Sequence, residues 1–288
     1  MPFLESSPCQ IGINGFGRIG MVDGLFSRLP RLTPIIGRNV LRASLLRQDV
    51  QIAAINHTCN SIADVIALLM HDSTHGPLSR LVTGLLSVCA LPNGNLSVNG
   101  HEIRLLSERD ATKIPWAVLG VEYVAECTGK FRSSALASAH VTFGRAKKVL
   151  ISAPCADAPT FVYKVNTSEY NRHKQTSVYS CASCTTNCLA PILKVLDSAF
   201  GVDQALMTTV HASTQSQHVL DGYSKKDRRA GRSIMGNIIP NFNRSSGRHY
   251  CRLARPAGSS QRHLGARARH KCVDGRPHRR HLESDFAS

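Results

Sequence analysis

The sequence predicts an α/β fold, in which a mostly parallel sheet covered by helices is followed by a shorter α+β part. Short apolar runs alternate with stretches of helical spacing, and this alternation is typical of βαβ units. A glycine-rich turn directly follows the first of those runs. The chain has 288 residues, enough for two domains, and 42% of them are hydrophobic, which indicates a folded protein.

The individual elements follow from the same two periodicities. Strands are expected at 10–15, 51–56, 122–128, 148–153 and 204–211, where the residues are apolar and often β-branched. Helices are expected over 38–46, over 61–70 and over the stretch that follows Cys184, which carries Pro191. Alternation of this kind places helices on both faces of the sheet.

The glycine-rich turn has the GxGxxG pattern of a dinucleotide site. Its glycines permit a tight turn and a close approach of backbone to a pyrophosphate, and the next helix start supplies N–H groups. The pattern therefore predicts a Rossmann-type domain, although a turn without a ligand is an equally good interpretation of six residues alone. We expect cofactor contacts from Gly15, Phe16, Gly17, Arg18, Ile19 and Gly20.

A cysteine stands where a helix is expected to begin. Cys184 follows a strand and precedes the helical stretch, and a helix start stabilises the thiolate that acts as a nucleophile. His211 ends the next expected strand and is a candidate base for that thiol. A buried structural cysteine and a structural histidine are the competing interpretations.

Two segments do not fit the α/β pattern. Residues 21–37 separate the glycine-rich turn from the helix that should follow it, and removing these 17 residues joins GFGRIG to RNVLRASLL. Residues 241–288 are rich in Arg, His, Gly and Ser and show neither period. We interpret the first as an insertion, of a size that a short retained intron would give, and the second as an aberrant tail.

Charge and composition exclude several classes of protein. The net charge is +16, and half of it lies in residues 241–288, which hold eleven Lys and Arg against three Asp and Glu. That tail has few aromatic side chains for base stacking, which argues against nucleic-acid binding. No apolar run reaches the roughly 18 residues of a membrane span, and the start lacks a secretory signal. Ten irregularly spaced cysteines predict no zinc site and a reducing, cytoplasmic location.

Seven short motifs occur in an order that identifies a family. They are INGFGRIG, HDSTHG, ECTG, ISAP, SCTTNCLAP, MTTVHAST and NIIP. Together they closely resemble the phosphorylating glyceraldehyde-3-phosphate dehydrogenases. The resemblance implies a Rossmann domain at 1–183, a partial catalytic domain at 184–240, a non-family tail at 241–288, and a homotetramer.

The resemblance also implies roles for individual residues. Cys184 would attack the aldehyde of glyceraldehyde 3-phosphate, His211 would act as the base, and NAD would take the hydride. Inorganic phosphate would then cleave the thioester to give 1,3-bisphosphoglycerate. Thr128 and Ser152 match positions that line the cofactor site, and Ser183, Thr185 and Thr214 match positions near the phosphate groups.

Departures from the family leave alternatives. The acidic residue expected at the end of the second strand is His57, and Tyr223 replaces a proline, so NADP is not excluded. The phosphate-binding loop and later strands expected after residue 240 are missing from the sequence. The alternatives are a paralogue that acts on erythrose 4-phosphate and a catalytically impaired remnant that binds nucleotide or RNA. A redox-sensing role for Cys184 is compatible with any of them.

Overall fold

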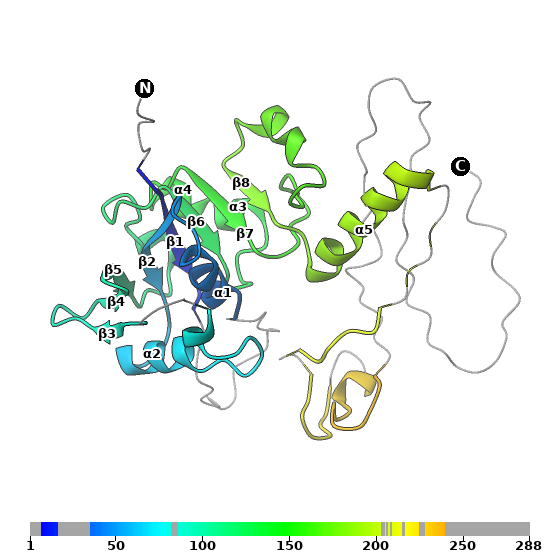
Figure 1. The fold of residues 1–288 in the computed structure, drawn as a ribbon, viewed down its shortest axis with the longest axis horizontal. Coiled ribbons are helices and arrows are strands. Elements are labelled where there is room, and N and C mark those ends of the chain that lie inside the picture. Colours follow the sequence, from blue (N-terminus) through cyan, green and yellow to red (C-terminus); the bar gives the residue numbers. More distant parts are fainter. Residues whose placement is uncertain are drawn as a thin grey trace, which may run out of the picture. The chain divides into compact units, whose positions relative to one another are not determined.

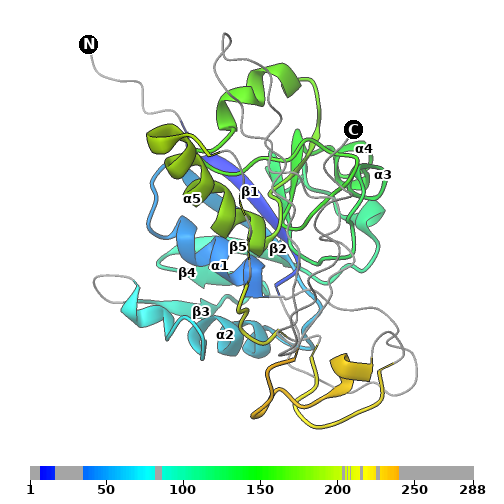
Figure 2. The ribbon, with the colours of Figure 1, turned by 90° about the vertical axis from the view of Figure 1, so that its right-hand side faces the viewer.

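The computed structural model describes residues 7–16, 35–81 and 86–202, and beyond these residues 205, 207, 209–214, 217–224 and 228–239. The chain divides into two compact units, Met1–Val195 with Thr214–Ser216, and Leu196–Ser213 with Gln217–Ser288. All helices and strands that frame the sheet belong to the first unit, which is shown as a ribbon in Figures 1 and 2.

The first unit is built on an eight-stranded sheet with the order β3-β4-β5-β2-β1-β6-β7-β8. All pairs from β5 to β8 are parallel, and the edge formed by β3, β4 and β5 is antiparallel. The mostly parallel sheet predicted from the sequence is therefore confirmed. The strands are β1 (Cys9–Asn14), β2 (Val50–Asn56), β3 (Val88–Ala90), β4 (Leu96–Val98), β5 (His101–Leu106), β6 (Tyr123–Glu126), β7 (Lys148–Ile151) and β8 (Val178–Ser180).

Helices cover both faces of this sheet. The helices that pack there are α1 (Ile35–Ser44), α2 (Ile62–Met70), α3 (Ser134–Ala137) and α4 (Ala139–Thr142). The helix α5 (Cys184–Phe200) follows β8 and extends into the second unit, and 3₁₀ turns lie at Leu78–Arg80, Ala111–Lys113, Thr167–His173 and Arg228–Gly231. Figure 2 shows α1 and α2 on one face and α3 and α4 on the other. None of the helices in the described part of the chain is long and apolar enough to cross a membrane.

Each face has its own hydrophobic core. On one face Leu41 of α1 and Leu69 of α2 pack with Ile13 and Ile55 of the central strands. On the other face Trp116 packs with Val124 of β6 and Ala137 of α3. These side chains are almost fully buried, and burial of this kind contributes about 1.5–3 kcal/mol for each large aliphatic residue. The two cores fix the central strands, and with them the loops at the strand ends.

Capping explains why α2 begins where it does. Ser61 accepts a hydrogen bond from the N–H of Asp64, and the Asp64 carboxylate accepts one from the N–H of Ser61. This reciprocal pair satisfies two N–H groups that a helix start leaves unpaired. The helix expected over 61–70 is thus confirmed, with Ser61 as its cap.

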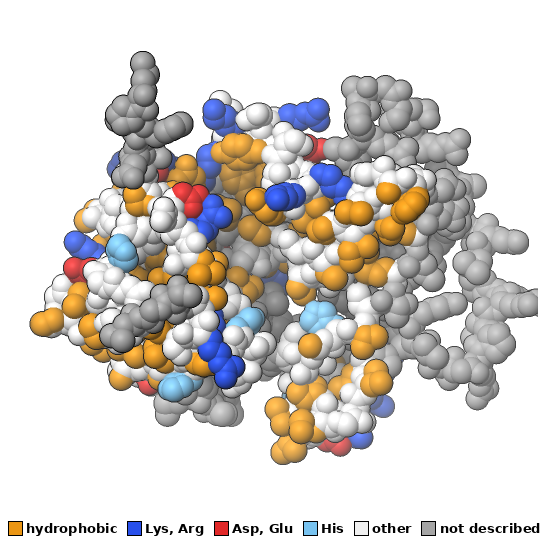
Figure 3. Space-filling model, in the orientation of Figure 1, with side chains coloured by type: hydrophobic (Ala, Val, Ile, Leu, Met, Phe, Trp, Pro, Cys, Tyr) orange, Lys and Arg blue, Asp and Glu red, His pale blue; other side chains and the backbone are white. Residues whose placement is uncertain are grey.

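The helix α5 carries an exposed apolar stripe. Ile192 and Val195 are 54% and 66% exposed, and Phe200 further along the helix is 83% exposed. Figure 3 shows hydrophobic side chains along this exposed side of α5. Exposed apolar side chains grouped in this way are typical of surfaces that contact other protein.

The second unit contains little regular structure among its described residues. A bridge pairs His218 with Ser233, Gly222 donates its N–H to Gly231 O at 2.8 Å, and Arg232 pairs with Asp221. The strand expected at 204–211 is wrong where the structure describes it, because residues 205, 207 and 209–211 lie outside any strand. Apolar spacing alone does not make a strand; a neighbouring strand must accept its hydrogen bonds.

Candidate active site and dinucleotide site

The order of the strands reverses at one point of the sheet. β1 pairs with β2 on one side and with β6 on the other, and Asn14 lies opposite Glu126 at their carboxyl ends. In open α/β sheets, ligands bind outside the carboxyl ends of the strands at such a reversal. This point therefore defines the candidate dinucleotide site.

The chain leaves β1 through a glycine that no other residue can replace without strain. Gly15 has φ 101°, and its N–H donates to Asn56 O at 2.9 Å. A Cβ on Gly15 would lie 2.8 Å from the backbone N and the Cγ2 of Thr128. The turns after β1 and β6 are thus in direct contact, and the positive φ of Gly15 agrees with the tight turn expected at the first glycine.

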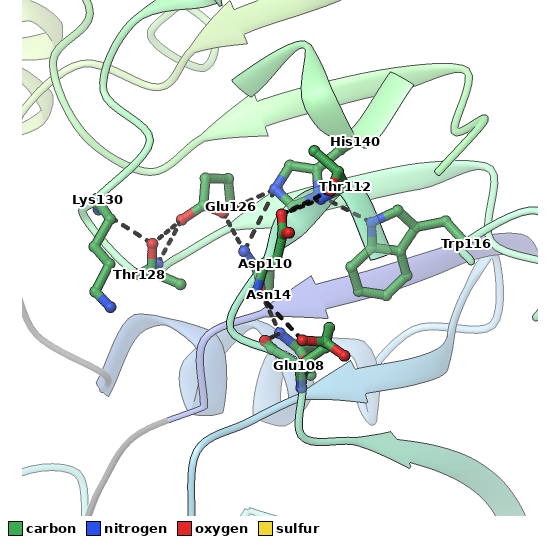
Figure 4. Close-up of polar contacts among 10 residues, drawn as sticks. Asn14, Glu108, Asp110, Thr112, Trp116, Glu126, Thr128, Lys130 and His140 are labelled. Atoms are coloured by element: carbon green, nitrogen blue, oxygen red, sulfur yellow. Dashed lines mark hydrogen bonds and ion pairs between the residues drawn. The ribbon is translucent and has the colours of Figure 1, made fainter. Parts of the chain in front are cut away.

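A buried carboxylate joins these two turns (Figure 4). Glu126 Oε1 accepts hydrogen bonds from the N–H of Thr128 at 2.7 Å and from its hydroxyl at 2.5 Å. Glu126 Oε2 accepts from Asn14 Nδ2 at 2.5 Å. Glu126 is 1% exposed, so these donors are what stabilises its charge away from water.

The fourth donor to this carboxylate is an imidazole in a fixed tautomer. Trp116 donates its indole N–H to His140 Nδ1 at 3.0 Å, and an indole nitrogen can only donate. The proton of a neutral His140 ring therefore lies on Nε2, which is 3.1 Å from Glu126 Oε2. Asn56 extends the network, since its Nδ2 donates to Asn14 Oδ1 at 2.7 Å.

The two cofactor-lining residues expected after β6 and β7 lie at this same edge. Thr128 lies in the turn after β6, and its hydroxyl also accepts the N–H of Lys130 at 3.1 Å. Ser152 directly follows β7, and its N–H donates to Glu126 O at 3.0 Å. Cys127, directly before Thr128, is buried, and burial together with the charge of Glu126 raises the pKa of its thiol to about 12. Cys127 is therefore a structural thiol.

His57 directly follows β2, at the position where an acidic residue was expected. Its Nδ1 accepts the N–H of Cys59 at 3.1 Å, which leaves the proton of the neutral ring on Nε2. Burial lowers the pKa of His57, so the ring is neutral at physiological pH. This strand end consequently offers a neutral donor in place of a carboxylate.

The candidate nucleophile begins a helix, as the sequence predicts. Cys184 is the first residue of α5 and is exposed. The preceding residue Ser183 caps the helix, since its Oγ accepts the N–H of Thr186 at 3.0 Å. Asn187 fixes the same turn from within, donating from Nδ2 to the carbonyls of Cys181 and Ser183. In general, the partial positive charge at the start of a helix stabilises a thiolate there and so favours a cysteine as nucleophile.

The backbone before Cys184 is strained. Ala182 has φ 63°, in the left-handed region that favours glycine, and its N–H donates to the buried Ser180 Oγ at 3.1 Å. Strained backbone of this kind clusters at functional turns, where it fixes the direction of a side chain. The neighbouring Cys181 is half-buried, and burial raises the pKa of its thiol. Cys184 and Cys188, in contrast, are exposed.

The other expected site residues lie in three different parts of the chain. Thr185 lies in the first turn of α5, and Thr214 belongs to the first unit and is exposed. His211 belongs to the second unit and is exposed, with Nδ1 2.6 Å from Ala212 O, and its pairing with Cys184 stays a prediction. Gly17, Arg18, Ile19 and Gly20 lie outside the described residues.

Sequence reasoning missed the buried network. Glu126 and His140 were not singled out, although a carboxylate inside an apolar strand is a signal for a satisfied buried charge. The signal available in the sequence was the single carboxylate in the apolar run YVAEC, and the structure shows alternating burial along β6 with Glu126 pointing inward. A histidine on the short helix α4 carries no comparable signal.

Strand order, the Gly15 turn and the helix-start cysteine together define an α/β protein with a candidate dinucleotide site and a candidate nucleophile. Residues 35–134 match the model of the glyceraldehyde 3-phosphate dehydrogenase NAD binding domain, and residues 183–250 match that of its C-terminal domain. The chain belongs to the glyceraldehyde-3-phosphate dehydrogenase family.

Individual relatives agree with this assignment. The chain is 46% identical over 231 residues to glyceraldehyde-3-phosphate dehydrogenase 1 of Mucor circinelloides f. lusitanicus, which covers 80% of this chain and 60% of the relative. It is 45% identical to the enzyme of Lentinula edodes over the same shares, and 44% identical to that of Schistosoma mansoni over 81% of this chain and 62% of the relative. The chain thus spans about 60% of the length of the relatives that it matches.

Proposed function

We propose that this chain is a glycolytic oxidoreductase that converts glyceraldehyde 3-phosphate, inorganic phosphate and NAD to 1,3-bisphosphoglycerate and NADH. The observation that carries the proposal is the exposed Cys184 at the start of α5, in a chain of this family. Family membership favours this reaction over the erythrose 4-phosphate and nucleotide-binding alternatives.

The described residues fit NAD. The turn at Gly15 has no room for a side chain beside Thr128, and such a turn lets a pyrophosphate approach the backbone. Phe16 continues that turn, and Thr128 and Ser152 line the edge beside it. When bound, NAD accepts a hydride from the substrate. The residues of this chain hold it at the reversal of the sheet, with the Glu126 network keeping the two turns together.

Cys184 performs the covalent chemistry. Its thiolate adds to the aldehyde carbon, and the carbonyl oxygen takes a proton to give a thiohemiacetal. His211 then removes that proton as the hydride leaves the same carbon, and a thioester forms. An oxygen of inorganic phosphate attacks the thioester carbon, the C–S bond breaks, and Cys184 leaves as the thiolate. Ser183, Thr185 and Thr214 are the residues that we assign to the phosphate groups.

Formation of NADH tests this proposal. The purified chain is mixed with NAD, phosphate and either glyceraldehyde 3-phosphate or erythrose 4-phosphate, and absorbance of NADH is followed. We expect a higher kcat/KM for glyceraldehyde 3-phosphate. A higher value for erythrose 4-phosphate would assign the chain to the other aldehyde, and no NADH from either would contradict the proposal.

Cofactor choice gives a second test, at His57. Replacing His57 by Asp puts a carboxylate at the end of β2, where it repels a 2′-phosphate and accepts hydrogen bonds from ribose hydroxyls. We expect H57D to lower the affinity for NADP relative to NAD by at least about tenfold. The change is compatible with the fold, because an Asp can accept the Cys59 N–H that His57 Nδ1 now accepts.

The matched control for this substitution is His101→Asp. His101 is exposed and begins β5, at the opposite end of the sheet from the carboxyl end of β2. Titration of NAD and NADP by calorimetry should give an unchanged ratio of affinities in H101D. An equal shift in H101D and H57D would show that overall charge, rather than the position of His57, sets the ratio.

Assembly and location complete the proposal. We propose a homotetramer in the cytoplasm; relatives include an enzyme named cytosolic and others named chloroplastic. Light scattering coupled to gel filtration tests the assembly, because a tetramer has four times the chain mass of 31.3 kDa. A single species at the mass of one chain would contradict the tetramer.

A further inference from the structure

The sequence offers two glycines for the last position of the dinucleotide turn. Ile19-Gly20 and Ile36-Gly37 are the same dipeptide, 17 residues apart. Removing residues 19–35 or residues 21–37 therefore leaves the identical sequence GFGRIGRNVL. Sequence alone cannot decide whether Gly20 or Gly37 follows the turn in space.

The structure places Gly37 against the turn. Gly37 lies in the first turn of α1 and is buried. A Cβ on Gly37 would lie 2.1 Å from Gly15 O and 3.0 Å from Ile13 Cγ2. The backbone of α1 thus touches the backbone of the turn after β1, and a side chain at this position would separate them. Close packing of helix against strand is the role of the third glycine in a dinucleotide fingerprint.

The same contact brings the start of α1 to the reversal of the sheet. α1 packs against β1, β2 and β6, the strands on either side of the reversal. The first N–H groups of a helix have no partner within it, and Ile35, Ile36 and Gly37 carry these groups here. Arg38 adds a cation beside the turn, donating from Nη1 to Phe16 O at 3.2 Å. N–H groups and positive charge at this place suit a pyrophosphate.

We propose that Gly37 rather than Gly20 is the third glycine of the dinucleotide turn, so that the first turn of α1 holds the pyrophosphate of NAD. The proposal rests on the proposed NAD-dependent function and sharpens it. It makes residues 19–35 the insertion, in place of residues 21–37. The match to the NAD binding domain begins at residue 35, which agrees with this register.

The same substitution at each of the two glycines tests which of them belongs to the dinucleotide turn. Binding of NAD to the full chain is measured by calorimetry for Gly37→Ala and Gly20→Ala. We expect G37A to bind NAD at least tenfold more weakly, because the added methyl group forces α1 away from the turn. We expect G20A to bind within twofold of the unchanged chain. Loss of affinity in G20A, or none in G37A, would overturn the proposal.

A measurement on the unchanged chain covers the case in which G37A does not fold. Hydrogen exchange is followed by mass spectrometry with and without saturating NAD. We expect NAD to slow exchange in peptides that contain Ile36 to Arg38 and to leave unaffected those peptides that contain Gly20 but begin after Arg18. Protection around Gly20 alone would overturn the proposal. If calorimetry detects no NAD binding to the unchanged chain, the proposed function fails instead, so the two failures are distinguishable.

Discussion

Replacing Cys184 by Ser is expected to lower the rate of NADH formation by at least about 10³-fold, because the hydroxyl is a far weaker nucleophile than a thiolate. Cys184 is exposed at the start of α5, where an aldehyde in solution can reach an exposed thiol. The affinity for NAD should be unchanged, since the cofactor site lies at the Gly15 turn. Steady-state kinetics and a calorimetric titration of NAD check the two expectations.

Cys188 provides the matched control. It is also exposed and lies one turn further along the same helix, so C188S makes the same chemical change on the same element. We expect C188S to retain activity within a few-fold. In a labelling experiment with iodoacetamide, Cys184 should react first. Equal losses of activity in the two variants would mean that Cys184 is not the nucleophile.

Replacing Glu126 by Ala is expected to lower the free energy of unfolding by about 3–5 kcal/mol, because two buried and two part-buried donors lose their acceptor. The donors are Thr128 N, Thr128 Oγ1, Asn14 Nδ2 and His140 Nε2. Folded domains are typically stable by only about 5–15 kcal/mol, so the loss is large. Replacing Glu126 by Gln should lower the free energy of unfolding by less, because the amide oxygen of Gln still accepts hydrogen bonds from one pair of these donors.

The measurement has a built-in probe and a close control. Trp116 is the only tryptophan of the chain and donates to His140, so its fluorescence during urea unfolding reports on this network. Glu122 lies just before β6, and its contact with Lys147 is an exposed ion pair. Such pairs contribute about 0–1 kcal/mol, and E122A should shift the unfolding curve little. A shift in E122A as large as that in E126A would contradict the role assigned to the network.

Much of the fold could be predicted from the sequence, because its central strands are short apolar runs between clear turns. The runs that became β1, β2, β6 and β7 were each identified, as was the helix that begins at Cys184. The β3–β4 hairpin was not identified, although Asn93-Gly94 in its turn was a usable signal. The expected strand at 204–211 failed because apolar spacing gives no information about whether a partner strand is present.

The site was less predictable, for reasons that differ between residues. The positions of Gly15 and Cys184 follow from local pattern, since a tight turn and a helix start are decided by neighbouring residues. The Glu126 network joins residues 112 positions apart in sequence, and only the folded sheet brings them together. The duplicated Ile-Gly dipeptide leaves the sequence with two candidates, Gly20 and Gly37, and the close contact of Gly37 with Gly15 is what favours Gly37.

The most direct test of the proposed reaction is the mass of the protein after one turnover without phosphate. The chain is saturated with NAD, mixed with glyceraldehyde 3-phosphate in phosphate-free buffer, and analysed by intact and peptide mass spectrometry. Without phosphate the thioester should persist, so we expect one phosphoglyceroyl group on the peptide that contains Cys184 and an equal amount of NADH. A chain that binds NAD but gains no acyl group at Cys184 would contradict the proposed reaction.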